Sequence, residues 1–197
     1  MRPARFTGVP VPPWEGIIPN FFRCVPVPVW ISAAAVPRHI FDVVGLFPVG
    51  VQPGEDADMW CRIALKYPIA FSHQTGAVYH LEAENRACRR PRHETPLSPI
   101  VVNLGEALKT GVLPAGVPRQ DIVEYKNKEH LFCAWVLLGA GALSEARAHV
   151  RAAASTRRFG LMWRAWYIYL CTLVPPRFLN WARRVRRQVT STQPNRT

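Results

Sequence analysis

Prolines crowd the beginning of this chain and limit what it can fold into. Seven of the nineteen prolines lie in the first 30 residues. Because each proline fixes φ and removes a backbone N–H donor, long helices and strands are unfavourable there. We therefore expect residues 1–28 to form an irregular proline-rich segment, with regular structure beyond it.

The positive charge of the chain is concentrated near its C-terminus. The formal net charge is +12, yet residues 1–146 hold 14 basic and 13 acidic side chains. Residues 147–197 hold 11 arginines and no acidic residue. Since 49% of the 197 residues are apolar and only 19% are charged, the chain can bury a core, and wholesale disorder is excluded.

Cysteine usage and hydropathy indicate the compartment. The five cysteines form no C-x-x-C pair, so a disulfide framework and a structural zinc site are not expected. Residues 1–14 lack the apolar core of a signal peptide, and no uncharged stretch reaches the ~18 to 20 residues of a membrane span. We expect a cytoplasmic protein in a reducing environment.

Apolar patterning predicts a small α/β region over residues 29–95. We expect strands at 29–36, 69–72 and 77–81, and helices at 38–44 and 55–66. In the longer helix Met59, Trp60 and Ile63 share one face. Asp58 precedes Arg62 by four residues there, in the order that favours an ion pair.

The remaining residues, 96–197, are predicted to be helical and to end in a basic tail. Helices are expected at 99–108, 122–138, 144–154, 159–173 and 177–188. Ser144 is a candidate N-cap. The predicted fold class is therefore α/β, with short strands of a mixed sheet and a helix, followed by an α-helical C-terminal region.

The sharpest local feature is the run Gly54-Glu55-Asp56 at the start of the helix predicted from residue 55. One interpretation is structural, because acids in a first turn complement the helix dipole and cap free amides. The other is functional, because a carboxylate held on a rigid helix start can act as a general base.

Four separate motifs follow one another across this region. They read PVWISA from residue 28, FDVVGLF from residue 41, GEDADMWCRIAL from residue 54 and AVYH from residue 77. Together they resemble the second half of family 2 glycosyltransferases. The family pattern is a strand, a V-G-x-F turn, an E-D pair opening a helix with W-x-R, and a strand ending in Tyr or His. The resemblance covers about residues 20–90.

The resemblance implies a GT-A-like fold and an inverting transfer of a sugar from a nucleotide-sugar donor. The acceptor would be a saccharide or a lipid-linked glycan of surface polysaccharide synthesis. Asp56 matches the acid that deprotonates the acceptor hydroxyl. Glu55 would orient the acceptor, while Trp60 and Arg62 would bind it or hold the helix in place.

The resemblance also implies a divalent metal, Mg²⁺ or Mn²⁺. His80 stands where metal-dependent members place a metal-binding histidine, although a strand-end histidine bonded to backbone is an alternative. The triplet Asp56-Ala57-Asp58 reads as the D-x-D metal signature of GT-A enzymes. Two residues apart on a helix, however, side chains point about 200° away from each other, so we do not assign a metal to it.

The family's donor half, with its nucleotide-binding strands and its own D-x-D, has no counterpart in residues 1–20. The chain is therefore expected to be an acceptor-side portion, whose remaining metal ligands lie in that missing half. Alone, it is expected to bind a nucleotide sugar poorly and to show no transfer.

The basic tail combines arginines with aromatic residues. Arg183-Arg184 and Arg186-Arg187 follow a segment containing Trp163, Trp166, Tyr167, Tyr169 and Trp181. The tail could be a solvated helical face, an anchor on an anionic membrane surface, or a nucleic-acid contact. A nucleic-acid partner is the least expected, because no RRM, KH or zinc-finger pattern accompanies the arginines. Membrane contact would place the protein at the inner face of the cell membrane. A non-enzymatic basic module is the alternative to the enzyme.

Overall fold

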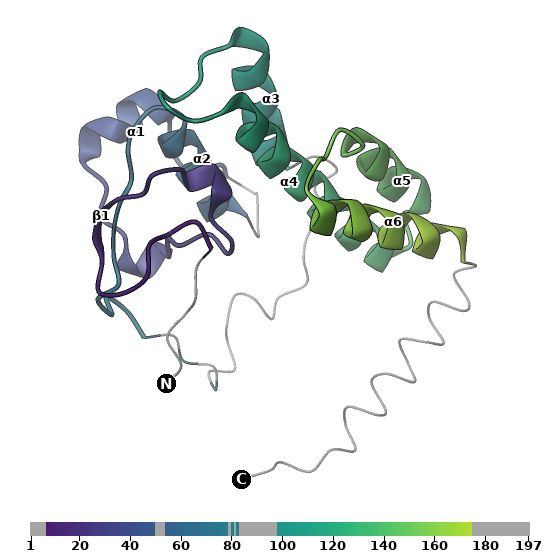
Figure 1. Ribbon diagram of the computed structural model, residues 1–197, viewed down its shortest axis with the longest axis horizontal. Coiled ribbons are helices and arrows are strands. Elements are labelled where there is room, and N and C mark those ends of the chain that lie inside the picture. Colours follow the sequence, from purple (N-terminus) through teal and green to yellow (C-terminus); the bar gives the residue numbers. More distant parts are fainter. Residues whose placement is uncertain (1–6, 50–53, 79, 81, 83–97, 175–197) are drawn as a thin grey trace. The chain divides into compact units, whose positions relative to one another are not determined.

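The fold is mixed α/β and mostly helical, with a small two-stranded antiparallel sheet (Figure 1). The computed structural model describes residues 7–49, 54–78, 80, 82 and 98–174. The chain divides into two compact units, Met1–Glu129 and His130–Thr197. The expected change from strands to helices near residue 95 therefore falls inside the first unit.

The first unit contains the sheet and the helices that precede residue 130. Its elements are β1 (Glu15–Ile17), the 3₁₀ helices Phe21–Arg23 and Ile31–Ala33, α1 (Arg38–Val44), α2 (Glu55–Ala64), β2 (Ala70–Ser72), α3 (Pro99–Thr110) and the first part of α4 (Arg119–Ala140). In the sheet Gly16 stands opposite Phe71. Ser72 Oγ donates to Glu15 Oε1 over 2.7 Å, so a side-chain bond reinforces this short pairing.

The N-terminal segment is more ordered than its prolines predict. It contributes β1 to the sheet, and the rings of Phe21 and Phe22 are buried. Asn20 caps the 3₁₀ helix Phe21–Arg23, because its Oδ1 accepts a hydrogen bond from Phe22 N (3.0 Å). Its Nδ2 donates to Asp121 Oδ2 at the start of α4 (2.9 Å). The segment expected to be irregular therefore contains two short regular elements, and side chains of α4 hold it in place.

One core unites the elements of the first unit. It is formed by apolar side chains from the 3₁₀ helix Phe21–Arg23 and from α1 to α4. Among the most deeply buried are Phe22, Met59, Leu104, Ile122 and Tyr125. The rings of Phe22 and Tyr125 meet edge to face, with centroids 5.6 Å apart. The face of α2 predicted to be apolar is the face that lies in this core, as expected for an amphipathic helix.

Two of the three predicted strands differ in the structure. Residues 29–36 contain a 3₁₀ turn, and Trp30 and Ile31 are more than half exposed. No strand pairs with this segment among the described residues, so its apolar composition alone does not make it a buried strand. Of residues 77–81, positions 77, 78 and 80 are outside any strand, and 79 and 81 lie outside the described residues. The strand predicted at 69–72 is confirmed as β2.

The predicted helices agree well with the structure. The one at 38–44 is α1, and it ends at Gly45, whose φ is +81°. The predicted helices at 55–66, 99–108 and 122–138 are α2, α3 and α4, with ends that agree to within three residues. Helix ends fray, so shifts of this size are ordinary.

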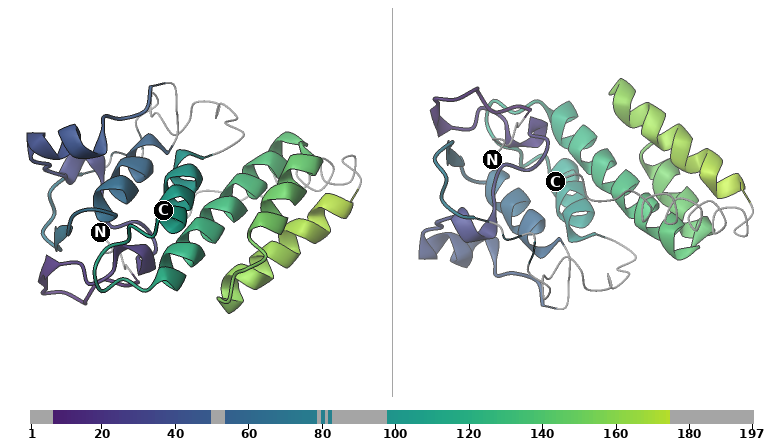
Figure 2. Two further views of the ribbon diagram at one scale, coloured as in Figure 1. Left: turned by 90° about the horizontal axis from the view of Figure 1, so that it is seen from above. Right: turned by 90° about the horizontal axis from the view of Figure 1, so that it is seen from below.

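The second unit is a small helical assembly. It contains the end of α4, α5 (Leu143–Ala152) and α6 (Phe159–Leu173), and α5 and α6 lie side by side (Figures 1 and 2). Arg147 Nη2 donates to Thr172 O over 2.7 Å and ties the two together. Ser144 is not the N-cap, because α5 begins one residue earlier, after Ala142. The basic helix predicted at 177–188 lies outside the described residues.

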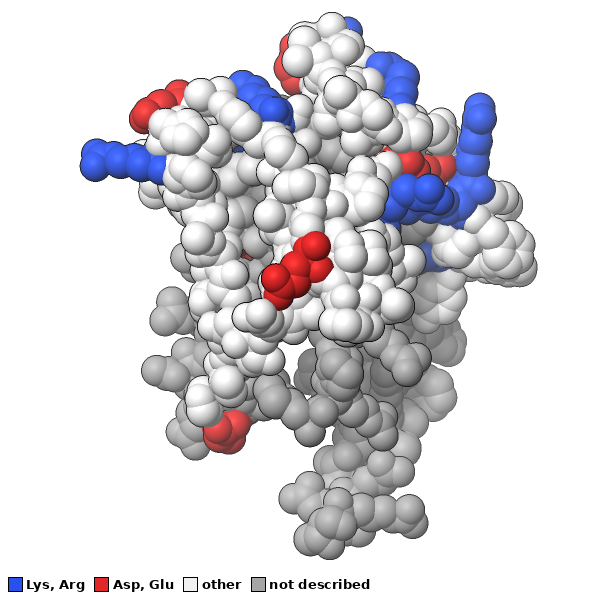
Figure 3. Space-filling view, turned by 60° about the vertical axis from the view of Figure 1, so that its left-hand side comes forward, with Lys and Arg blue, Asp and Glu red and all other residues white. Residues whose placement is uncertain are grey.

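On the face drawn in Figure 3, charged side chains are sparse and of both signs. Figure 3 shows acidic and basic side chains scattered over one face, with uncharged surface between them. This agrees with the near-neutral balance of residues 1–146.

Candidate functional site

The start of α2 brings together three of the acids singled out in the sequence. Gly54 precedes the helix with φ +119°, a left-handed conformation that glycine adopts without strain. Its carbonyl accepts the first helical bond, from Asp58 N (3.0 Å). Glu55, Asp56 and Asp58 then fill a first turn whose free amides carry partial positive charge.

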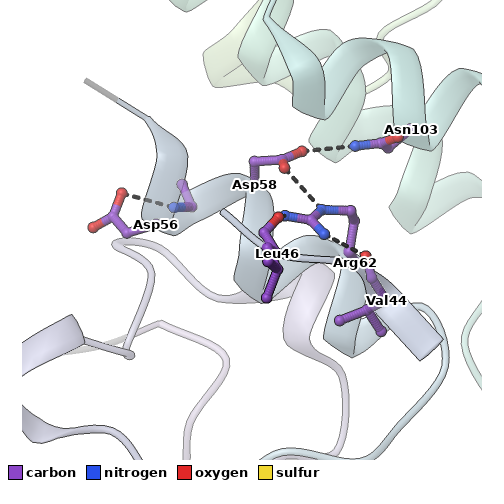
Figure 4. Close-up of polar contacts among 7 residues, drawn as sticks. Val44, Leu46, Asp56, Asp58, Arg62 and Asn103 are labelled. Atoms are coloured by element: carbon purple, nitrogen blue, oxygen red, sulfur yellow. Dashed lines mark hydrogen bonds and ion pairs between the residues drawn. The ribbon is translucent and has the colours of Figure 1, made fainter. Parts of the chain in front are cut away.

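Asp58 links α2 to α3 through its side chain. Its side chain is 2% exposed, and its Oδ2 lies 2.8 Å from Arg62 Nε. Its Oδ1 accepts from Asn103 Nδ2 on α3 (2.7 Å; Figure 4). Both carboxylate oxygens are therefore engaged inside the protein, which gives Asp58 a structural role.

Arg62 extends this network to the turn after α1. Its Nη1 donates to Val44 O, and its Nη2 donates to Leu46 O over 3.0 Å. The Arg62 side chain is 15% exposed. A planar guanidinium can serve a carboxylate and two carbonyls at once, so Arg62 fixes the turn at Gly45 against α2.

Asp56 faces away from that network. Figure 4 shows its carboxylate on the opposite side of the helix start from Asp58, Arg62 and Asn103. Its Oδ1 accepts from Ala57 N over 2.7 Å, and the residue is only partly buried. This bond orients the carboxylate, and its second oxygen makes no hydrogen bond with the described residues. Of the two aspartates in this turn, Asp56 is thus the one with a carboxylate oxygen that makes no hydrogen bond with the described residues.

Glu55 and Trp60 each carry a buried polar atom without a hydrogen-bond partner among the described residues: Glu55 Oε2 and Trp60 Nε1. The Glu55 residue as a whole is partly exposed at the helix start. Trp60 is 4% exposed and meets the ring of Phe47 edge to face. Glu55 is therefore only partly accessible, with its Oε2 buried, whereas Trp60 packs α2 into the core.

His80 is paired with Glu82. Its Nδ1 is 2.9 Å from Glu82 Oε1, and both side chains are well exposed. The pKa of Glu82 is lowered, first by a bond from its own backbone N–H and then by His80. Within the described ranges no hydrogen bond or ion pair joins His80 to α2, and no three His, Cys, Asp or Glu side chains come together as metal ligands.

The sequence reasoning missed Asn103. It is a polar residue in an otherwise apolar helical run, next to the buried Leu104, and asparagine is a poor former of helix interiors. A polar residue at such a position is the signal from which a buried hydrogen bond could have been predicted. Only the fold shows that its partner is Asp58.

Comparison with known proteins leaves the site to be interpreted from its own geometry. No protein family, curated protein or solved structure matches this chain. Among the helices that the structure describes, none combines the length and apolar character needed to cross a membrane.

Proposed function

We propose that this chain forms the acceptor side of an inverting, nucleotide-sugar-dependent glycosyltransferase in which Asp56 is the general base. The observation that carries the proposal is the division of roles within one helical turn. Asp58 is buried and fully paired, whereas Asp56 is oriented by one backbone amide and open to an approaching group. The motifs shared with family 2 glycosyltransferases support the same assignment.

The proposed step is a proton transfer coupled to sugar transfer. A sugar hydroxyl is a weak nucleophile, and a carboxylate within about 3 Å can take its proton during attack. The acceptor oxygen would form the new bond to the anomeric carbon as the bond to the nucleoside diphosphate breaks from the opposite face. Asp56 would hold the proton, and inversion follows from the single displacement.

The other residues of α2 have supporting roles in this proposal. Glu55, which is partly exposed at the helix start, would accept a hydrogen bond from another acceptor hydroxyl. Trp60 and Arg62 would keep the helix start in position. The acceptor class is a saccharide or a lipid-linked glycan.

A divalent cation would need more ligands than His80 and Glu82 offer. Mg²⁺ and Mn²⁺ take several oxygen or nitrogen ligands, whereas His80 and Glu82 supply one pair among the described residues. A metal at His80 would need ligands from outside these residues. No part of the proposed proton transfer is assigned to a metal.

The proposal is tested first by acceptor binding, which does not require a donor. Purified 1–197 is screened against an array of oligosaccharides and lipid-linked glycans, and binding is quantified by ligand-observed NMR. We expect a glycan to bind, and Glu55→Gln to weaken binding severalfold. Asp42→Asn, which changes an exposed acid on α1, is the matched control. If no glycan binds, or if both variants behave alike, the acceptor site is wrong.

A further inference from the structure

The outer face of α6 is unusually apolar for a surface helix. Its exposed side chains include Phe159, Met162, Trp163, Trp166, Tyr167, Leu170 and Leu173, each at least 41% exposed. The opposite face of the helix, with Ile168 and Thr172, is buried in the second unit. Because the helix is apolar on both sides while only one side is packed, the outer side is expected to have a partner.

The exposed aromatics of α6 contact one another and a tryptophan of α4. Phe159, Met162, Trp163 and Trp166 line a hollow of about 270 Å³. Phe159 and Trp163 meet edge to face, with centroids 6.0 Å apart. Tyr167 stacks on Trp135 of α4, which is itself 45% exposed. We call these exposed residues of α6, together with Trp135, the aromatic face.

The part of the sequence that holds this face is rich in arginine. Arg157 and Arg158 precede α6, and Arg164 lies exposed within it. Beyond Glu145 the sequence contains no acidic residue, and six further arginines follow position 174. A second copy of this unit would bring arginine toward arginine, which opposes self-association through the aromatic face.

An anionic lipid surface fits both properties. Trp and Tyr rings favour the boundary between headgroups and acyl chains, where one side is apolar and the other is wet. Lipid phosphates accept hydrogen bonds from guanidinium groups and neutralise their charge. We propose that the aromatic face of α6 docks the protein on an anionic bilayer, with its side chains entering the headgroup region and the arginines contacting lipid phosphate.

Point substitutions are the appropriate test, because deleting α6 would remove Ile168 and Thr172 from the core. Trp163→Gln/Trp166→Gln removes two side chains that are 63% and 60% exposed. The matched control is Trp30→Gln/Ile31→Gln, which removes two side chains that are 53% and 57% exposed in the first unit. Circular dichroism and urea unfolding establish that both variants of the full chain remain folded.

Binding is measured by flotation with vesicles of phosphatidylcholine alone or mixed with phosphatidylglycerol. We expect the wild-type chain and the control to float with the mixed vesicles, and the α6 variant to bind at least about tenfold more weakly. Higher salt should weaken wild-type binding, since part of the attraction is electrostatic.

Several results would overturn the proposal. They are failure of the wild-type chain to bind mixed vesicles, equal binding to phosphatidylcholine alone, and undiminished binding of a folded α6 variant. Dimerisation that the α6 substitutions abolish, without vesicle binding, would assign the face to a second copy. Preference for single-stranded RNA over mixed vesicles would assign it to nucleic acid.

Discussion

Asn103 donates a hydrogen bond to Asp58 across 45 positions of sequence, and this bond joins α3 to the first turn of α2. The acceptor is a carboxylate that is 2% exposed and already paired with Arg62. The start of α2 is thus held in place on its inner side by Asp58, an acid with almost no access to solvent. The position of Asp56 depends on this anchoring.

Replacing Asn103 by alanine should destabilise the protein by about 1 to 3 kcal/mol, because a buried carboxylate oxygen loses its donor. Urea unfolding followed by circular dichroism measures the difference. Val102→Ala, at the half-exposed neighbouring position on α3, is the control and should cost much less. Equal losses for the two variants would mean that the Asn103 bond contributes nothing specific.

Replacing Arg62 by lysine should loosen the turn after α1. Lysine can keep the charge near Asp58, but it cannot also serve the carbonyls of Val44 and Leu46 in a planar fork. We expect a loss of about 1 to 2 kcal/mol and faster amide exchange around Gly45. Arg38→Lys, at an exposed position of α1, should leave both unchanged. Unaltered exchange in the Arg62 variant would contradict this account of the turn.

Replacing Asp56 by asparagine separates the two interpretations of the acidic helix start. In an enzyme completed with a donor half, we expect turnover to fall by about 10²-fold or more, since a general base contributes about that much. Stability should change little, because asparagine keeps the size and much of the capping ability. Asp42→Asn is the control. Turnover within tenfold of the parent would show that Asp56 is a helix cap and not the base.

The buried thiol of Cys61 should make stability fall at alkaline pH. Burial raises its pKa from 9.0 to about 12, so above pH 9 the unfolded chain releases a proton that the folded chain retains. The stabilisation is complete below pH 9 and is lost as the pH rises toward 12, with a limiting slope of about 1.4 kcal/mol per pH unit. The difference in unfolding free energy between wild type and Cys61→Ala, measured from pH 8 to about pH 10.5, should shrink accordingly. A constant difference would show that the thiol is not protected.

Sequence periodicity was a good guide to the helices and a poor guide to the sheet. α1 and α6 match their predicted ranges, and the Asp58–Arg62 pair forms as its spacing predicts, because these features depend on residues a few positions apart. The β1–β2 pairing joins segments more than fifty residues apart, and nothing local in the proline-rich start predicts it.

The candidate site shows the same limit. The sequence could place Asp56 and Asp58 in one helical turn and pair Asp58 with Arg62, but it could not show the division into a buried and a partly exposed acid. That division depends on Asn103, which reaches the turn only when α3 packs against α2. Local pattern therefore finds candidate residues, and tertiary contacts decide which of them remain open to a ligand.

The anchoring of Asn20 to Asp121 has a consequence for how the protein is made. These residues are 101 positions apart, and the rings of Phe21 and Phe22 rest on Tyr125 of the same helix. During synthesis the N-terminal segment leaves the ribosome long before its partners in α4 are translated. Two phenylalanine rings therefore lack their partners in α4 until that helix has been translated, so this part of the core can close only after α4 emerges.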